Sequence, residues 1–310
     1  MIRVLITDTH FGWKQNSITW LNSQMKFLDE QLIPFLERQT DDVRLIHLGD
    51  IFDSRSSINP MVAKAVRERF TKMRSLVKDF YIVAGNHDFY SPNSDEIDSL
   101  SLAFQDMDIN LVIRDIVYAD GDAFIPWYKY KEIESVSNIR NIFTHADIFG
   151  EDRKVFPGVR IFSGHIHIPQ INKRMGLYNL GSCYPLNFAD ANQERFMYVL
   201  TDDGQLISTS NSKSINFWRI HNMDIFNPID SDQDYYEFYI DQTNMQNPEY
   251  QSRIAELAKR LKNMWVIPVI PSLIAEGEEM SSYNIDEICE SLIPDHLKEK
   301  FQIIKNQVQA

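Results

Sequence analysis

The chain has 310 residues, 44% of them hydrophobic and 24% charged, so it can bury a large core, and its composition excludes disordered and fibrous proteins. The formal net charge of -13 argues against nucleic-acid binding through overall charge, because Lys and Arg hold phosphate backbones. We expect a cytoplasmic protein, because the sequence has neither a signal peptide nor an apolar run of membrane-spanning length, and its two cysteines lie far apart.

Short apolar runs separated by helical patterns fill the first half of the chain. Apolar residues recur with helical spacing over residues 21–35 and 62–77, which predicts crossover helices packed on a largely parallel sheet. An α/β fold follows from this alternation. The predicted buried strands lie at residues 4–6, 45–48, 80–83, 142–143 and 159–162.

A second group of strands follows at residues 123–125, 178–180, 196–200 and 206–209. The last two are separated by Thr-Asp-Asp-Gly at residues 201–204, a composition suited to a hairpin turn. We predict that these strands form a second, partly antiparallel sheet against the first. The result would be a sandwich of two mixed sheets flanked by helices.

The character of the sequence changes after about residue 220. We predict a first domain over residues 1–220 and a small α+β cap over 221–274, with a strand at 235–240, a helix at 248–264 and a strand at 265–270. Residues 275–282 contain three glutamates and a glycine and are predicted to be a linker. Residues 283–310 are predicted to form a tail of two short amphipathic helices.

Polar residues of metal-binding type follow the predicted strands. The carboxyl ends of neighbouring strands in an open α/β sheet share one crevice, so groups far apart in sequence converge there. Oxygen and imidazole groups without a thiolate suit a divalent ion such as Mn, Fe or Zn, and two such ions can drive an in-line phosphoryl displacement. The residues are Asp8, His10, Asp50, Asp53, Asn86, His87, His145, His165 and His167.

The ordered set Asp-x-His, Gly-Asp-x-x-Asp, Gly-Asn-His-Asp, a single His and Gly-His-x-His resembles the calcineurin-like metallophosphoesterases. Further segments resemble the SbcD-type nuclease subunit, the bacterial and phage relative of the eukaryotic double-strand-break repair nuclease. The resemblance covers about residues 1–220. The segments that resemble the SbcD-type subunit lie at residues 8–12, 49–54, 125–127 and 181–186.

The resemblance implies a role for each site residue. Asp50 would bridge two ions, expected to be manganese, with Mg, Fe or Zn as alternatives. His87 would stand beside the scissile phosphate as an acid or charge stabiliser, and Asp53 would orient it. The first ion would be held by Asp8, His10, Asp50 and His167, and the second by Asp50, Asn86, His145 and His165.

The resemblance also implies a function. The protein would be a metal-dependent DNA nuclease, an exonuclease on duplex ends and an endonuclease on single strands, in an SbcCD-like recombination and repair complex of a bacterium or phage. It would form a homodimer through its early helix, where Ile18, Trp20 and Phe27 lie off the main apolar stripe. An SbcC-type ATPase would dock on the C-terminal helices. The alternatives are a small-substrate phosphodiesterase or phosphoprotein phosphatase of the same fold, and a scaffold that does not cut.

Three further features have competing interpretations. The run of basic residues within 64–74 is either a DNA-binding patch or, more simply, a solvated helix face. His47 lies on a predicted buried strand and is expected to be a packed or hydrogen-bonded core histidine. Asp88 either supports the metal ligands or caps the next segment.

Overall fold

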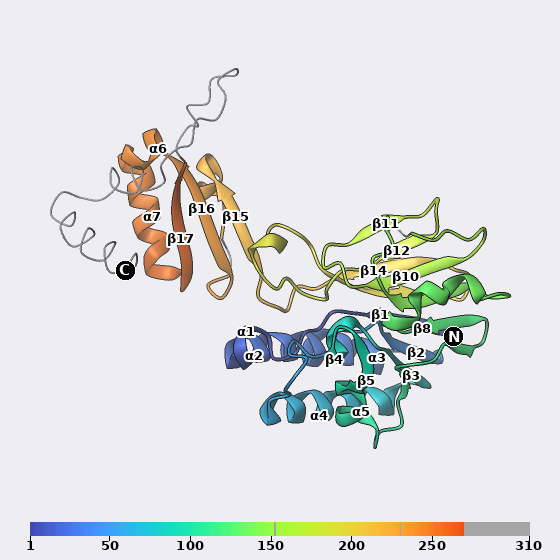
Figure 1. Ribbon diagram of the computed structural model, residues 1–310. Helices are drawn as coiled ribbons and strands as arrows, with labels where there is room; N and C mark the ends of the chain where they lie inside the picture. Colours follow the sequence, from blue (N-terminus) through green and yellow to red (C-terminus); the bar gives the residue numbers. More distant parts are fainter. Residues whose placement is uncertain (152, 230, 270–310) are drawn as a thin grey trace, which may run out of the picture. The chain divides into compact units, whose positions relative to one another are not determined.

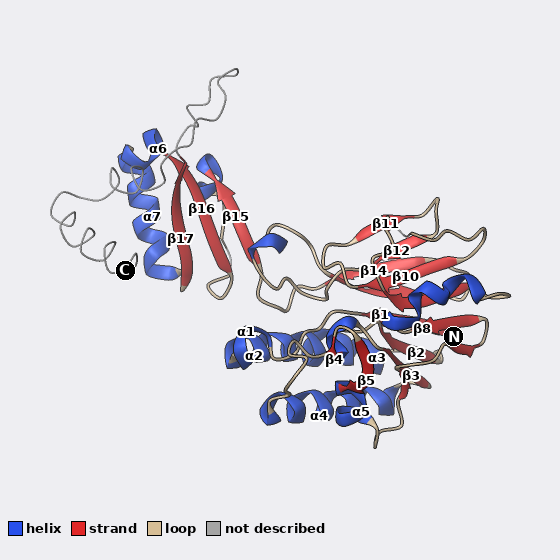
Figure 2. Cartoon of the chain, viewed as in Figure 1, coloured by secondary structure: helices blue, strands red, loops and turns tan. Residues whose placement is uncertain are grey.

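The computed structural model describes residues 1–151, 153–229 and 231–269. Residues Met1–Pro268 form one compact unit. The described strands form two six-stranded sheets, a three-stranded sheet and a two-stranded hairpin (Figures 1 and 2). The predicted linker at 275–282 and tail at 283–310 lie outside the described residues. No helix in the described ranges is long and apolar enough to cross a bilayer.

The first sheet has a parallel centre. β1, β2, β3 and β6 run parallel, and β13 pairs antiparallel with β1. The β13–β14 hairpin confirms the turn predicted at residues 201–204. In spatial order the strands are β14 (Leu206–Ser210), β13 (Phe196–Leu200), β1 (Ile2–Ile6), β2 (Val43–His47), β3 (Asp79–Val83) and β6 (Asn110–Val112).

The second sheet also has a parallel centre, formed by β8, β9, β10 and β12, with antiparallel strands at both edges. The α/β sandwich of mixed sheets is confirmed, but the predicted distribution of strands was wrong. Residues 142–143 and 159–162 belong to the second sheet, whereas the 196–210 hairpin extends the first. In spatial order the strands are β11 (Gln170–Asn172), β12 (Leu177–Asn179), β10 (Arg160–Gly164), β9 (Asn141–His145), β8 (Asp122–Ile125) and β7 (Val117–Ala119).

Helices cover the outer face of the first sheet (Figure 1). The helical pattern at residues 21–35 is one nearly continuous run, in which a π-helical turn at Leu28–Leu32 joins α2 to α3. The Asn59 side chain caps the start of α4, and Pro60 occupies its first turn, where no backbone N–H is needed. The helices are α1 (Trp13–Asn16), α2 (Ile18–Phe27), α3 (Ile33–Glu37), α4 (Pro60–Leu76) and α5 (Ser99–Phe104).

An apolar layer lies between the two sheets. Leu5 and Ile46 of the first sheet pack in the same buried cluster as Phe143 and Phe162 of the second. The ring of Phe124 stacks on that of Tyr81, with centroids 4.1 Å apart. A separate buried cluster lies on the outer face of the second sheet, where the 3-10 segment Trp127–Ser135 packs. This apolar layer holds the two sheets together face to face.

The remaining described residues form smaller elements. β4 (Phe89–Ser91) and β5 (Ser94–Asp98) make a hairpin directly after the Gly-Asn-His-Asp segment. The small α+β group has its own core and consists of β15 (Phe217–His221), β16 (Tyr235–Asp241), β17 (Asn263–Val269), α6 (Gln242–Gln246) and α7 (Pro248–Arg260) (Figure 2). β15 spans the boundary predicted at residue 220. Helix α7 ends earlier than predicted, because Leu261 is already extended.

Candidate metal centre

The predicted metal ligands follow strands of both sheets. Asp8 and His10 come after β1, and Asp50 and Asn86 come after β2 and β3 of the same sheet. The other ligands belong to the second sheet: His145 ends β9, and His165 and His167 follow β10. Because the sheets pack face to face, the carboxyl ends of these strands meet, and all seven side chains come together.

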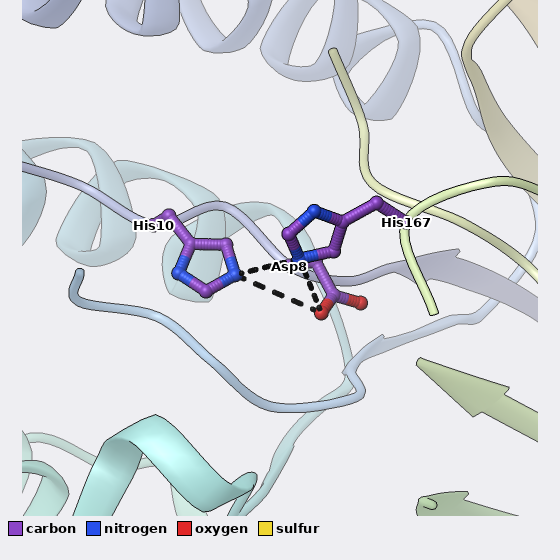
Figure 3. Close-up of side chains that lie close together, drawn as sticks. All are labelled: Asp8, His10 and His167. Carbon is purple, nitrogen blue, oxygen red and sulfur yellow. Dashed lines mark hydrogen bonds and ion pairs between the residues drawn. The ribbon is translucent and has the colours of Figure 1, made fainter. Parts of the chain in front are cut away.

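The first group consists of Asp8, His10 and His167 (Figure 3). The Nε2 atoms of the two histidines are 3.2 Å apart. Each of them lies 3.8 Å from Oδ1 of Asp8. Three potential ligand atoms therefore face one small space.

The second group is formed by Asp50, Asn86, His145 and His165. The Asn86 Oδ1 atom lies 3.1 Å from Nε2 of His145 and 2.9 Å from Nδ1 of His165. Oδ2 of Asp50 is 3.3 Å from Nε2 of His145. The Nδ1 atom of His145 donates to the Leu48 carbonyl, so Nε2 is the ring nitrogen that can bind a cation once its proton is displaced.

Asp50 lies between the two groups. Its Oδ1 atom accepts a hydrogen bond from the His87 backbone N–H at 2.7 Å. Its Oδ2 atom is 3.7 Å from Nε2 of His10 and 3.3 Å from Nε2 of His145. One oxygen is thus held by the backbone while the other faces both groups, which is the position that a bridging ligand requires.

Burial controls the protonation of these histidines. It lowers the pKa of His10 to about 3 and that of His165 to about 4, so both imidazoles are neutral at neutral pH. Burial also opposes protonation of His145, but the adjacent Asp50 carboxylate outweighs it and raises the His145 pKa to about 9. Without a cation the Asp50–His145 pair therefore holds a proton, which a metal ion would displace on binding.

The donor set fits divalent cations. The Nε2 atoms of His10 and His167 can share an N–H···N hydrogen bond at 3.2 Å without a cation, and together with the buried Asp8 carboxylate they offer a cation two nitrogens and an oxygen. In the described part of the chain no Lys or Arg forms an ion pair with Asp8 or Asp50. Carboxylate, amide and imidazole ligands together suit hard or borderline ions.

His87 lies at the edge of the first group. Its ring centroid is 4.9 Å from that of His10. Its Nδ1 atom donates to the backbone carbonyl of Asp53 at 2.8 Å, so Nε2 is the ring nitrogen left for a substrate. Orientation of His87 by the Asp53 carboxylate stays a prediction; one carboxylate oxygen of Asp53 lies within 4.8 Å of a ring nitrogen of His87. The carboxylate itself lies 3.9 Å from Nδ1 of His10, whose hydrogen-bonding capacity is otherwise unused.

Asp88 connects the loops that carry the ligands. This buried carboxylate accepts hydrogen bonds from the backbone N–H groups of Asp50, Ile51 and Gly85 at 2.8–3.0 Å. It therefore supports the centre by fixing the turn after β2 to the turn after β3. Burial, together with the nearby Asp50 charge, raises the Asp88 pKa to about 7.

Several ligands have a strained backbone. Asp8, His10, Asp50 and His165 adopt positive φ angles of 50°, 39°, 54° and 81°. Gly49, directly before Asp50, has φ 95°, and a Cβ there would lie 2.6 Å from the Gly85 nitrogen and 2.8 Å from Nδ1 of His145. The loop conformation that presents the ligands thus requires glycine at this position.

Sequence reasoning missed three supporting side chains. Thr7 Oγ1 donates to Asp8 Oδ2 at 2.6 Å, and Gln24 Nε2 on α2 donates to the carbonyl of His10 at 3.0 Å. Arg55 Nη1 donates to the backbone carbonyl of Asn86. None belongs to a spacing motif, because each acts through the tertiary fold. His47 is a buried histidine hydrogen-bonded to Thr9, as predicted.

The fold and the site define a metal-dependent phosphoesterase. The sequence profile of the calcineurin-like phosphoesterase family matches residues 3–179, more than half of the chain. The chain therefore belongs to the calcineurin-like phosphoesterase family, and it is a hydrolase that uses divalent metal ions. No curated protein matches the sequence.

Proposed function

We propose that the protein is a manganese-dependent DNA nuclease that degrades duplex ends and cuts single strands. One observation carries the proposal: the segments that resemble SbcD-type subunits all contact the ligand loops. The Trp127 ring lies 4.8 Å from that of His165, Cys183 Sγ donates to the carbonyl of Thr7, and Trp13, just after the first such segment, donates to the carbonyl of Leu186. Partly exposed Trp127 supplies an aromatic surface for a base next to the centre.

The chain's own residues divide the work of hydrolysis. When bound, two divalent cations supply Lewis-acid activation of the phosphate and a hydroxide near neutral pH. Asp8, His10 and His167 would hold one cation and Asn86, His145 and His165 the other, with Asp50 available to both. His87, with its hydrogen on Nδ1 held by the Asp53 carbonyl, directs Nε2 to the substrate. In its protonated form His87 can give a proton to the leaving oxygen.

Cleavage of labelled DNA tests the proposal directly. End-labelled duplex and single-stranded DNA are incubated with Mn²⁺, Mg²⁺ or a chelator, with bis-p-nitrophenyl phosphate as a small diester. We expect DNA shortening in Mn²⁺ and none in the chelator. Hydrolysis of the small ester with intact DNA in every metal would instead favour a small-substrate phosphodiesterase.

Replacing His87 tests its role as a proton donor. We expect His87→Ala to lower kcat on DNA by about 10²–10⁴-fold, with unchanged metal content. The loss on bis-p-nitrophenyl phosphate should be smaller, because nitrophenolate leaves without a proton. Rate assays on both substrates and elemental analysis of dialysed protein measure this. An equal loss on both substrates would assign His87 to charge stabilisation.

The small-substrate alternative has one observation in its favour. The candidate basic patch on α4 is neutralised, because each of its five cations forms an ion pair with a carboxylate. The pairs are Lys64–Glu68, Arg67–Asp106, Arg69–Asp29, Lys72–Glu37 and Arg74–Asp108. The paired carboxylates offset the positive charge that α4 could offer to DNA, and the DNA cleavage assay decides between the two functions.

The proposed assembly is a homodimer that docks on an SbcC-type ATPase. Of the three apolar residues singled out on α2, Trp20 and Phe27 are buried within the chain and only Ile18 is exposed, at 61%. A dimer through this helix would therefore use Ile18 together with neighbouring surface. The ATPase contact stays a prediction, because the tail at residues 283–310 lies outside the described residues.

A further inference from the structure

Among the described residues, Arg55 is a cation beside the metal centre without a carboxylate partner. Most arginines of the described chain form ion pairs, but no ion pair involves Arg55 among the described residues. Its guanidinium is partly buried, and Nη1 donates to the backbone carbonyl of Asn86, the residue whose side chain faces His145 and His165. In a chain with a net charge of -13, such a group attracts an anion close to the site.

The peptide bond between Asn86 and His87 shows where Arg55 lies relative to Asp50. The His87 N–H of this bond points to Asp50. Because the bond is trans, its carbonyl points the opposite way, and Arg55 binds that carbonyl. Arg55 therefore lies one peptide unit away from Asp50, beside the metal centre rather than in it.

Tyr128 is a neighbour of the guanidinium. Burial raises the pKa of Tyr128, and the nearby Arg55 charge opposes that rise, which places the two side chains close together. The Tyr128 hydroxyl donates to the carbonyl of Ser91, and its ring packs against Phe89 with centroids 4.8 Å apart. Nη1 is occupied by Asn86, while the structure shows no protein partner for Nε or Nη2 among the described residues.

We propose that Arg55 binds the phosphate group next to the scissile one and thereby favours a polynucleotide over an isolated phosphodiester. A guanidinium can contact two phosphate oxygens at once, and its anchored Nη1 lowers the entropy lost on binding. A substrate with one phosphate fills the metal centre and leaves Arg55 unused. This inference rests on the proposed action on DNA and names a residue that provides its selectivity.

The test measures how much a second phosphate strengthens binding. Thymidine dinucleotide and trinucleotide, which carry one and two phosphates, are used to inhibit the initial rate of bis-p-nitrophenyl phosphate hydrolysis. In the wild type we expect the second phosphate to lower Ki by about tenfold, and the gain should shrink as salt rises. In Arg55→Ala the gain should fall below about twofold, with Arg55→Lys between the two.

A control variant and the possible outcomes distinguish a failure of the Arg55 inference from a failure of the proposed nuclease activity. Arg38→Ala removes an exposed arginine that forms no ion pair within the described part of the chain, and it should keep the full gain. An equal gain in Arg55→Ala and the wild type, or no gain in the wild type, overturns the role of Arg55. Oligonucleotides that inhibit through Arg55 but are never cleaved would refute the nuclease and leave the phosphate site standing.

Discussion

Asp50→Asn is expected to lower kcat on bis-p-nitrophenyl phosphate by at least about 10³-fold, because metal catalysis contributes several kcal/mol to the barrier. Asp50 Oδ2 is the oxygen that faces both His10 and His145. An amide is neutral and binds a cation more weakly, so metal content after dialysis should fall from two ions to one or fewer. Rate assays and elemental analysis measure the two effects.

The fold should survive this change. Asn tolerates the positive φ of 54° at this position, and its oxygen can still accept from the His87 N–H. Asp41→Asn, at an exposed position, is the matched control and should behave as wild type. A variant at Asp50 that keeps two ions and a rate within tenfold of wild type would show that this carboxylate is not the bridge.

Asp88→Ala is expected to lower the free energy of unfolding by about 3–6 kcal/mol. The change leaves the backbone N–H groups of Asp50, Ile51 and Gly85 without an acceptor in a buried place. It also frees the turn after β2 from the turn after β3, so metal binding should weaken as well. Denaturant unfolding at equilibrium gives the free energy, and metal titration gives the affinity.

The exposed Asp41→Ala serves as a control for the general effect of losing an aspartate. It should change stability by less than about 0.5 kcal/mol. If Asp88→Ala cost under about 1 kcal/mol, water would have replaced the carboxylate at these three groups. The loops would then keep their places without it.

The surroundings of the basic side chains could be read only from the structure. The basic run on α4 indicated either a DNA patch or a solvated face, and the ion pairs of Arg67 with Asp106 and Arg74 with Asp108 favour the latter. Those partners lie more than thirty residues away in sequence, so no local pattern marks them. Arg55 belongs to none of the predicted ligand motifs, and its place beside the metal centre is known only from its contact with Asn86.

The sequence by itself determined the α/β class, the crossover helices, the hairpin at residues 201–204 and the set of residues that the fold brings together. These features are local: strand and helix periods, turn composition and ligand types that directly follow strands. His47 was also placed correctly, because it lies within an apolar strand.

Only the tertiary structure decided which strands share a sheet and which atoms face which. β13 pairs with β1 across almost two hundred residues, and β9 and β10 lie in the sheet opposite β1, so the ligands meet across two sheets rather than along one. Long-range backbone pairing of this kind depends on how whole faces pack, not on the composition of a segment. The same packing places the His87 ring against the Asp53 carbonyl and the Asp88 carboxylate against three backbone N–H groups. The sequence did not predict these contacts, because a contact with main-chain atoms leaves no trace in a pattern of side chains.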